Sequence, residues 1–271
     1  ICFQETRLGP DNIYLFEHNS FSDIYPYQYW SSSMGTGGRS SNRYSGTSVW
    51  SKYKPINVEY DLDGLGDREG RVIKVTFSNC IVINTYTPNS GSNFDYRINH
   101  WEPILKENLK KLNNLDIPVI YCGDFNIANK KDVWFGDALE AEYEKTTDVA
   151  TKTSILKKIK SKTKLHTGEI FTPSYSKQER DAYNSLLIET HFIDCFRHLK
   201  PNIFNEFTWF NIRDKTSFKH NRGWLIDRFI VNSRYSKKIN NCKILRKIGM
   251  RNKDGNLISD HLPIFLDIDL K

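Results

Sequence analysis

The succession of patterns over residues 70–126 restricts the fold of this chain more than any other stretch. Apolar and polar residues alternate over 70–77 and a continuous apolar run follows over 80–83, which predicts a β-hairpin. Apolar residues then recur every three or four positions over 96–112, as in an amphipathic helix that packs on a sheet. Another apolar run follows at 117–120. A hairpin, a helix and a strand in this order predict layers of helices and sheets and argue against a helical bundle.

The last of these apolar runs leads into Gly123-Asp124-Phe125-Asn126, which puts a carboxylate and an amide just after a predicted strand. Gly123 allows a sharp turn, and Asp124 and Asn126, two residues apart, point the same way. Strand ends in layered α/β folds open onto the functional edge of the sheet. The tetrapeptide is also typical of a surface β-turn. A second polar cluster before an apolar run, Ser259-Asp260-His261, favours the functional interpretation.

Length and charge limit the classes of protein to consider. With 271 residues the chain is long enough for one large α/β domain, and its 13% aromatic content argues against a disordered protein. The formal net charge of +7 favours a polyanionic partner such as nucleic acid. No stretch of the sequence approaches the roughly 20 apolar residues of a membrane span, so no association with a membrane is expected.

The cysteines and the first residues bear on the cellular compartment. The five cysteines are odd in number, lack Cys-x-x-Cys spacing and mostly lie in apolar runs. They predict buried free thiols, without a disulfide or zinc, in a reducing intracellular compartment, the nucleus or the cytoplasm. Residues 1–5 already resemble the end of a strand, so further residues are expected before Ile1, with room for a targeting segment.

Five predicted strand edges carry polar side chains suited to chemistry. They are Glu5, Tyr86 with Asn89, Asp124 with Asn126, Trp224 with Asp227 on a strand predicted over 223–231, and Asp260 with His261. Together they offer mainly hard oxygen ligands, which Mg²⁺ or Mn²⁺ prefers, whereas zinc would normally recruit more His or Cys. Glu5 and Asp260 are the predicted metal ligands.

These residue types meet the needs of phosphoryl transfer to water. That reaction requires a metal to neutralise phosphate charge, a group that activates the water and a donor to the developing charge. Asp124 is suited to activate the water. Asn126 could brace the turn that holds Asp124 or contact the phosphate. His261 can donate to phosphate if Asp227 holds its other ring nitrogen. Each residue alone also has an ordinary interpretation, such as a surface charge, but their recurrence at successive strand ends favours a shared site.

Several segments resemble the motifs of the endonuclease/exonuclease/phosphatase superfamily, and more narrowly its exonuclease III-type abasic-site endonucleases. They are Phe3-Gln4-Glu5-Thr6-Arg7, residues 86–91, 123–126, 196–202, 223–229 and 259–263, and Asp67-x-Glu69-Gly70-Arg71. The Glu, Gly-Asp-x-Asn and Ser-Asp-His motifs are shared across the superfamily and specify only phosphoester chemistry. The Tyr-x-Pro-Asn turn and Gly-Trp-x-x-Asp identify the branch.

The resemblance implies a role for each polar group near the metal. Glu5 would carry the metal with Asp260 beside it. Asp227 would orient His261, which would stabilise the phosphate.

The resemblance also implies which residues contact the phosphate and which line the sugar pocket. Tyr86 and Asn89 would contact the scissile phosphate, and Asp124 with Asn126 would align the water. Trp209 and Trp224 would wall the pocket that takes an extruded abasic sugar.

Three departures from the family pattern stand out. The family begins with a strand that ends in Trp-Asn-x-(Asn/Asp)-Gly, and no residues here match it, so a sheet would lose a strand and the site an Asn or Asp. Ser92 stands where some relatives place an arginine that wedges into DNA. Residues 137–166 are predicted to form an inserted, partly helical surface segment; a solvated charged helix is the favoured interpretation and a contact with a phosphate backbone the alternative.

The sequence as a whole predicts an α/β sandwich of two packed mixed β-sheets flanked by helices, DNase I-like, in a single domain over 1–271 that acts as a monomer. The predicted function is a Mg²⁺-dependent hydrolase, with Mn²⁺ as a substitute, that incises DNA 5′ to abasic sites, accompanied by 3′-phosphodiesterase and 3′–5′ exonuclease activity. The alternatives are another nuclease or phosphatase of the superfamily, or a DNA-binding relative that has lost catalysis.

Overall fold

The computed structural model describes residues 1–17, 21–34, 44–135, 145–159, 164–166, 169–248, 250 and 258–270. The first residues of the segment predicted as an insertion, 137–144, lie outside the described residues, as does the side chain of Ser92. Within the described parts of the chain, no helix is long and apolar enough to cross a membrane.

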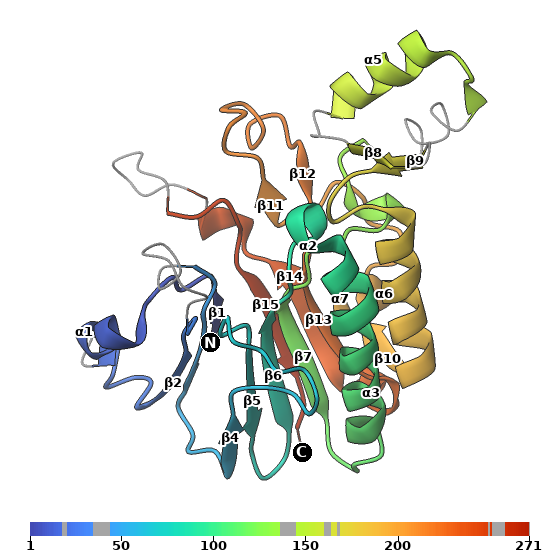
Figure 1. Cartoon of the computed structure of the whole chain (residues 1–271). Helices are drawn as coiled ribbons and strands as arrows, with labels where there is room; N and C mark the ends of the chain where they lie inside the picture. Colours follow the sequence, from blue (N-terminus) through green and yellow to red (C-terminus); the bar gives the residue numbers. More distant parts are fainter. Residues whose placement is uncertain are drawn as a thin grey trace.

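A six-stranded mixed sheet forms the centre of the molecule (Figure 1). Its strands, in spatial order, are β10 (Phe192–Asp194), β13 (Asp227–Asn232), β7 (Val119–Asp124), β6 (Ile81–Tyr86), β5 (Val72–Thr76) and β4 (Asn57–Glu59). The predicted hairpin is confirmed as the antiparallel pair β5–β6, and the predicted strand as β7. Only β6 and β7 run parallel, because a helical crossover joins them.

Helices cover one face of this sheet. The crossover contains α2 (Ser90–Tyr96), a π-helical turn (Arg97–Trp101) and α3 (Glu102–Asn113), and α6 (Lys177–Thr190) packs beside it. The helix predicted over 96–112 therefore begins earlier, at Ser90, where the Asn89 side chain accepts a hydrogen bond from the backbone of Gly91. Trp101, Leu105 and Leu109 form the apolar face that is buried against the sheet.

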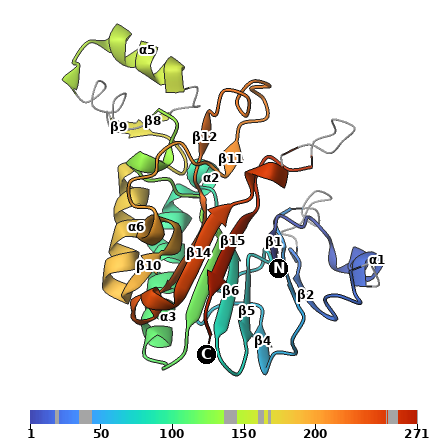
Figure 2. The ribbon, with the colours of Figure 1, turned by 180° about the vertical axis from the view of Figure 1, so that it is seen from behind.

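The second layer lies on the other face and consists of two separate pieces. One is the antiparallel sheet β1 (Cys2–Gln4), β3 (Thr47–Ser51) and β2 (Tyr27–Ser31); the other is the hairpin β14 (Ile239–Ile244) and β15 (Ile264–Ile268). Seen from behind, strands of the six-stranded sheet are visible between the two pieces (Figure 2). The predicted sandwich of packed sheets is confirmed, with this division of its second layer.

The remaining described elements lie mostly at the end of the molecule that is uppermost in Figure 1. They are α1 (Tyr14–Glu17), α5 (Val149–Ile159), β8 (Lys164–His166), β9 (Glu169–Phe171), α7 (Cys195–Leu199), β11 (Trp209–Phe210) and β12 (Gly223–Trp224). The prediction of a single strand over 223–231 is wrong, since β12 and β13 are separate strands. The chain between them turns aside because the Leu225 amide donates to the Asp132 carbonyl.

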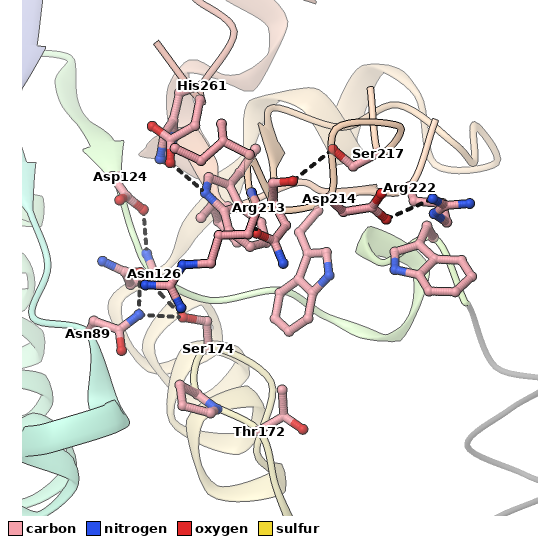
Figure 3. A pocket seen from close by; sticks show the side chains of 18 of the residues that line it. Asn89, Asp124, Asn126, Thr172, Ser174, Arg213, Asp214, Ser217, Arg222 and His261 are labelled. Carbon is pink, nitrogen blue, oxygen red and sulfur yellow. Dashed lines mark hydrogen bonds and ion pairs between the residues drawn. The ribbon is translucent and has the colours of Figure 1, made fainter. Parts of the chain in front are cut away.

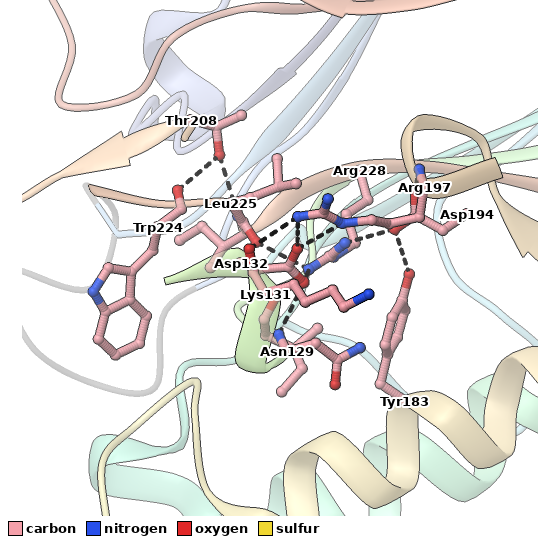
Figure 4. A network of polar contacts seen from close by, with 12 residues as sticks. Asn129, Lys131, Asp132, Tyr183, Asp194, Arg197, Thr208, Trp224, Leu225 and Arg228 are labelled. Atoms are coloured by element: carbon pink, nitrogen blue, oxygen red, sulfur yellow. Dashed lines mark hydrogen bonds and ion pairs between the residues drawn. The ribbon is translucent and has the colours of Figure 1, made fainter. Parts of the chain in front are cut away.

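A buried ionic network joins β13, β10, α6 and α7 (Figure 4). Arg228 on β13 contacts the carboxylates of Asp132 and Asp194, each with an N–O distance of 2.5 Å, and all three side chains are almost completely buried. Arg197 on α7 also pairs with Asp132, and Tyr183 on α6 donates to Asp194 at 3.1 Å. Each buried charge thus has an opposite charge beside it, which burial requires.

Candidate active site

Three polar residues lie side by side where β6, β7 and β13 meet. Tyr86 ends β6 and pairs in parallel register with Asp124, which ends β7. Asp227 begins the antiparallel strand β13 and lies directly opposite Asp124. A phenol and two carboxylates that are distant in sequence therefore share one sheet edge.

The polar cluster near the chain end is brought to this edge by β11. The Phe210 amide donates to the Asp260 carbonyl at 3.0 Å, and the Leu262 amide donates to the Thr208 carbonyl at 2.7 Å. These bonds fix His261 so that its Nδ1 lies 2.8 Å from Oδ2 of Asp227. The predicted pairing of Asp227 with His261 is present in the structure.

The turn after β7 needs its glycine because two strands approach closely there. Gly123 has a φ of +130°, and a Cβ at this position would lie 1.9 Å from the Thr85 carbonyl oxygen on β6. The chain then turns so that the Asn126 amide donates to Oδ1 of Asp124 at 2.8 Å. Asp124 is consequently held in one orientation by its own turn.

The Asn126 side chain ties this turn to two neighbouring segments (Figure 3). Its Nδ2 donates to the Thr87 carbonyl at 2.8 Å, while its Oδ1 accepts from Asn89 at 3.1 Å and from Ser174 at 3.3 Å. Of the two roles predicted for Asn126, the geometry favours bracing the turn, since the carboxamide already has three protein partners.

Glu5 reaches the site from the end of β1. Its Oε1 accepts a hydrogen bond of 2.5 Å from the Tyr86 phenol, and Oε2 accepts from Nε of Arg7 at 2.9 Å. Although burial opposes the change, the hydrogen bonds from Tyr86 and Arg7 lower the pKa of Glu5. Glu5 is therefore a carboxylate at neutral pH.

Asp124 and His261 have strongly shifted pKa values. Burial and, to a smaller extent, the charge of Asp227 raise the pKa of Asp124 to about 7, although the charge of His261 opposes the rise. Burial alone would lower the pKa of His261, but the charge of Asp227 and the hydrogen bond to it raise that pKa to about 10. At neutral pH His261 is a cation, and Asp124 is near the midpoint of its titration.

Nine of the ten predicted residues line one cavity of about 500 Å³, namely Glu5, Tyr86, Asn89, Asp124, Asn126, Trp209, Trp224, Asp260 and His261. The tenth, Asp227, is 8% exposed and lies behind His261. Trp209 and Trp224 are cross-strand neighbours on β11 and β12, with ring centroids 5.9 Å apart and an interplanar angle of 80°. The two indoles thus form an apolar wall beside the polar floor.

Other lining residues were not predicted from the sequence. Trp134 adds a third indole, and Thr172 and Ser174 come from the turn before α6. The loop 211–222, between β11 and β12, contributes Arg213 and Arg222. The sequence could have indicated this loop. If the two strands that carry Trp209 and Trp224 pair as a hairpin, the basic residues between them lie beside the tryptophans.

Glu5 and Asp260 could hold a divalent cation, since both carboxylates line the cavity. Indole Nε1 of Trp209 donates to Oδ2 of Asp260 at 3.2 Å and helps to orient it. In the part of the chain that the structure describes, no group of three or more His, Cys, Asp or Glu is arranged to hold a metal. Two carboxylates suit Mg²⁺, which usually keeps several waters, better than an ion that needs a full protein cage.

Comparisons with known proteins identify the family of the chain. The model of the Endonuclease/Exonuclease/phosphatase family matches residues 1–261. An exodeoxyribonuclease of Bacillus subtilis (strain 168) is 30% identical over 280 residues, covering 100% of this chain and 88% of the relative. A DNA-(apurinic or apyrimidinic site) endonuclease of Dictyostelium discoideum is 28% identical over 276 residues, covering 100% of this chain and 63% of the relative.

Solved structures share the fold. An AP endonuclease from Archaeoglobus fulgidus superposes with a TM-score of 0.71 at 22% identity, covering 99% of this chain and 88% of that one. A 3′ phosphatase from Neisseria, bound to a product DNA hairpin, gives a TM-score of 0.70 at 22% identity with the same coverage. These likenesses bear out the predicted DNase I-like sandwich. Because the family model extends over residues 1–261, the chain belongs to the Endonuclease/Exonuclease/phosphatase family.

Proposed function

We propose that this protein is a DNA-repair nuclease that cleaves the phosphodiester on the 5′ side of an abasic site. The observation that carries the proposal is the cavity in which the Asp124 carboxylate and the cationic His261 face a wall formed by Trp209 and Trp224. A base, a phosphate-binding cation and an apolar sugar pocket are the parts that such a reaction requires.

In the proposed reaction, Asp124 takes a proton from the attacking water as the water oxygen bonds to phosphorus and the bond from phosphorus to the 3′ oxygen breaks. The 3′ oxygen leaves as a hydroxyl after taking a proton from solvent water, and the phosphate stays on the 5′ oxygen of the abasic sugar. The Nε2 proton of His261 stabilises charge on a phosphate oxygen, while Asp227 holds Nδ1 and keeps the ring aligned. Tyr86 and Asn89 would contact the same phosphate. Asn126 keeps Asp124 in place through its backbone amide.

Glu5 and Asp260 would hold Mg²⁺, or Mn²⁺ in its place. When bound, such a cation supplies positive charge to the phosphate and so lowers the cost of the negative charge that builds up in the transition state. The lowered pKa of Glu5 keeps a ligand ionised for it.

The names of the relatives support DNA as the substrate, since one is an exodeoxyribonuclease and the other an endonuclease at apurinic or apyrimidinic sites. Exonuclease and 3′-phosphodiesterase activities are proposed as accompaniments, because the same groups act on any phosphodiester that enters the cavity. We also propose a monomer, since all ten site residues come from one chain. The free and mostly buried cysteines suit the predicted reducing compartment.

The test compares cleavage of two duplexes in Mg²⁺, identical except that one contains a single abasic site. The parent should cut the abasic duplex much faster and on its 5′ side. Asp124→Asn should lose about 100-fold or more in kcat, because general-base catalysis contributes roughly that much. Equal cutting of both duplexes would favour a less specific nuclease of the family. Binding without cutting by the parent would favour the DNA-binding relative.

A further inference from the structure

The Asp67-x-Glu69-Gly70-Arg71 motif remains without a role in the proposed reaction. None of its four residues lines the cavity. Arg71 is nevertheless only 2% exposed, although a cation of this size is seldom fully buried without a specific reason. Its neighbours show where the motif acts.

Arg71 holds Tyr86 at three points. Nη1 donates to the Tyr86 carbonyl at 3.0 Å, the Tyr86 amide donates to the Arg71 carbonyl at 2.8 Å, and the guanidinium carbon lies 4.7 Å from the centre of the phenol ring. The other two guanidinium nitrogens also donate, Nε to Glu69 at 2.6 Å and Nη2 to the Tyr44 hydroxyl at 3.0 Å. With all three nitrogens bound to fixed partners, the planar guanidinium of Arg71 has one orientation.

The rest of the motif shapes the turn that presents Arg71. The Asp67 carboxylate accepts the amides of Glu69 at 2.9 Å and Arg71 at 2.5 Å. Gly70 has a φ of +64°, and a Cβ there would lie 2.5 Å from the Ser31 carbonyl oxygen. The turn therefore requires an Asp and a Gly at these positions, which accounts for the spacing of the motif.

The other end of Tyr86 reaches the site. Its phenol donates to Glu5 at 2.5 Å, and Glu5 and Tyr86 both line the cavity. We infer that Arg71 is a positioning residue, which fixes the Tyr86 ring so that its hydroxyl stays directed at Glu5 and at the phosphate that the cavity would hold. The inference rests on the proposed function, because it assigns a duty to Tyr86 in that reaction. Lysine cannot replace the arginine fully, since a single ammonium cannot serve three directions in one plane.

The experiment is a double-mutant cycle of Arg71→Met and Tyr86→Phe, measured as kcat and KM on the abasic duplex. Each single variant should lower kcat about 10-fold or more, with KM changed by roughly twofold or less, because a misplaced group costs transition-state contacts. The double variant should be no slower than the slower single variant, since Arg71 acts through the hydroxyl that Tyr86→Phe removes. The inference would be overturned if the loss of kcat in the double variant equalled the product of the two single losses, or if kcat of Arg71→Met were unchanged.

A second variant and a structural measurement complete the design. Arg71→Lys keeps the charge and should restore part of the activity; it also replaces Arg71→Met in the cycle if that variant does not fold. Crystal structures of the folded Arg71 single variants should have the Tyr86 hydroxyl displaced from Glu5, and an unmoved hydroxyl would refute the inference even if the parent proved inactive. Activity of the parent tests the proposed function separately.

The matched control is Lys74→Met, which removes a cation three residues further along β5. Lys74 pairs with Glu59 on β4 and does not line the cavity. Its kcat should equal that of the parent. A similar loss in Lys74→Met would assign the effect of Arg71→Met to general damage of the strand and would count against the inference.

Discussion

Among single residues, the pair of carboxylates that face each other across β7 and β13 determines the chemistry of the site. Asp124 and Asp227 are register partners, and only Asp227 has a cation in hydrogen-bond contact. The unequal surroundings separate their tasks. Burial raises the pKa of Asp124 to about 7, which suits this carboxyl to accept a proton near neutral pH, whereas Asp227 orients His261 through the hydrogen bond to its Nδ1.

This asymmetry predicts the pH dependence of the reaction. With a pKa of about 7, Asp124 is protonated at lower pH, so kcat/KM should rise with pH through a midpoint near 7. The charge of Asp227 helps to raise that pKa. In Asp227→Asn the rise should therefore move to lower pH, in addition to any loss of maximal rate. Initial rates on the abasic duplex between pH 5 and 9 would measure this shift. The prediction would be contradicted if kcat/KM of the variant rose over the same pH range as that of the parent.

The residues of the site differ in how far the sequence could foretell them. Asp124 and Asn126 follow an apolar run and Asp260 and His261 precede one, and strand edges of this kind are visible as local patterns. Trp134 and Ser174 gave no such signal, because they reach the cavity only through distant partners: the Trp134 amide bonds the Gly223 carbonyl, and the Ser174 hydroxyl bonds Asn126. Side chains placed by long-range contacts cannot be located from local periodicity.

Among the elements, those with a strong period were predicted and those defined by long-range contacts were not. The hairpin β5–β6, strand β7 and helix α3 each carry their pattern in consecutive residues. The break between β12 and β13 lies where the Leu225 amide bonds the carbonyl of Asp132, a residue far away in the sequence. The Asp132 side chain belongs to the buried ionic network, which meets strand β10 and helix α7, so loss of that network would affect several elements at once.

Substituting one member of that network should therefore unfold the protein more easily. Asp132→Asn removes an anion from between Arg228 and Arg197, both of which stay charged and mostly buried. Removing one partner of a buried ion pair typically costs about 3–5 kcal/mol, so the free energy of unfolding should fall by roughly that amount. Denaturant titration would measure the change.

The control for this prediction is Asp181→Asn on α6. Asp181 pairs with Lys177 on the surface, where its side chain is 60% exposed. An exposed pair contributes about 0–1 kcal/mol, so this variant should remain close to the parent. Equal effects of the two substitutions would mean that the buried network does not stabilise the fold as described.

For the whole molecule, the net charge of +7 acts together with the placement of cations at the mouth of the cavity. Arg213 and Arg222 line it from the loop 211–222 between β11 and β12, at the end of the molecule that is uppermost in Figure 1. A protein that neutralises phosphates with Lys and Arg releases counterions, which makes its binding depend steeply on salt.

Duplex affinity should accordingly fall linearly on a plot of log K against log salt concentration. Arg213→Ala should reduce the magnitude of the slope by about one, because one phosphate contact contributes about 0.9. The reduction should be the same for abasic and undamaged DNA, since phosphates carry no damage signal. Lys111→Ala, which removes an exposed cation that pairs with Asp63 far from the cavity, should leave the slope unchanged. Fluorescence anisotropy at several salt concentrations measures both, and a flat response of the parent would argue against DNA binding.

The division of the second layer into two pieces gives the proposed metal ligands unusual positions in the chain. Glu5 follows β1 in one piece and Asp260 precedes β15 in the other, so a cation held by both would link the two ends of the sequence. In polymer terms, a link between distant residues removes more configurational freedom from the unfolded chain as the closed loop lengthens. We expect that the bound ion would close a loop that contains most of this chain and would thereby stabilise the folded state. A chelator would then lower the melting temperature as well as halting the reaction.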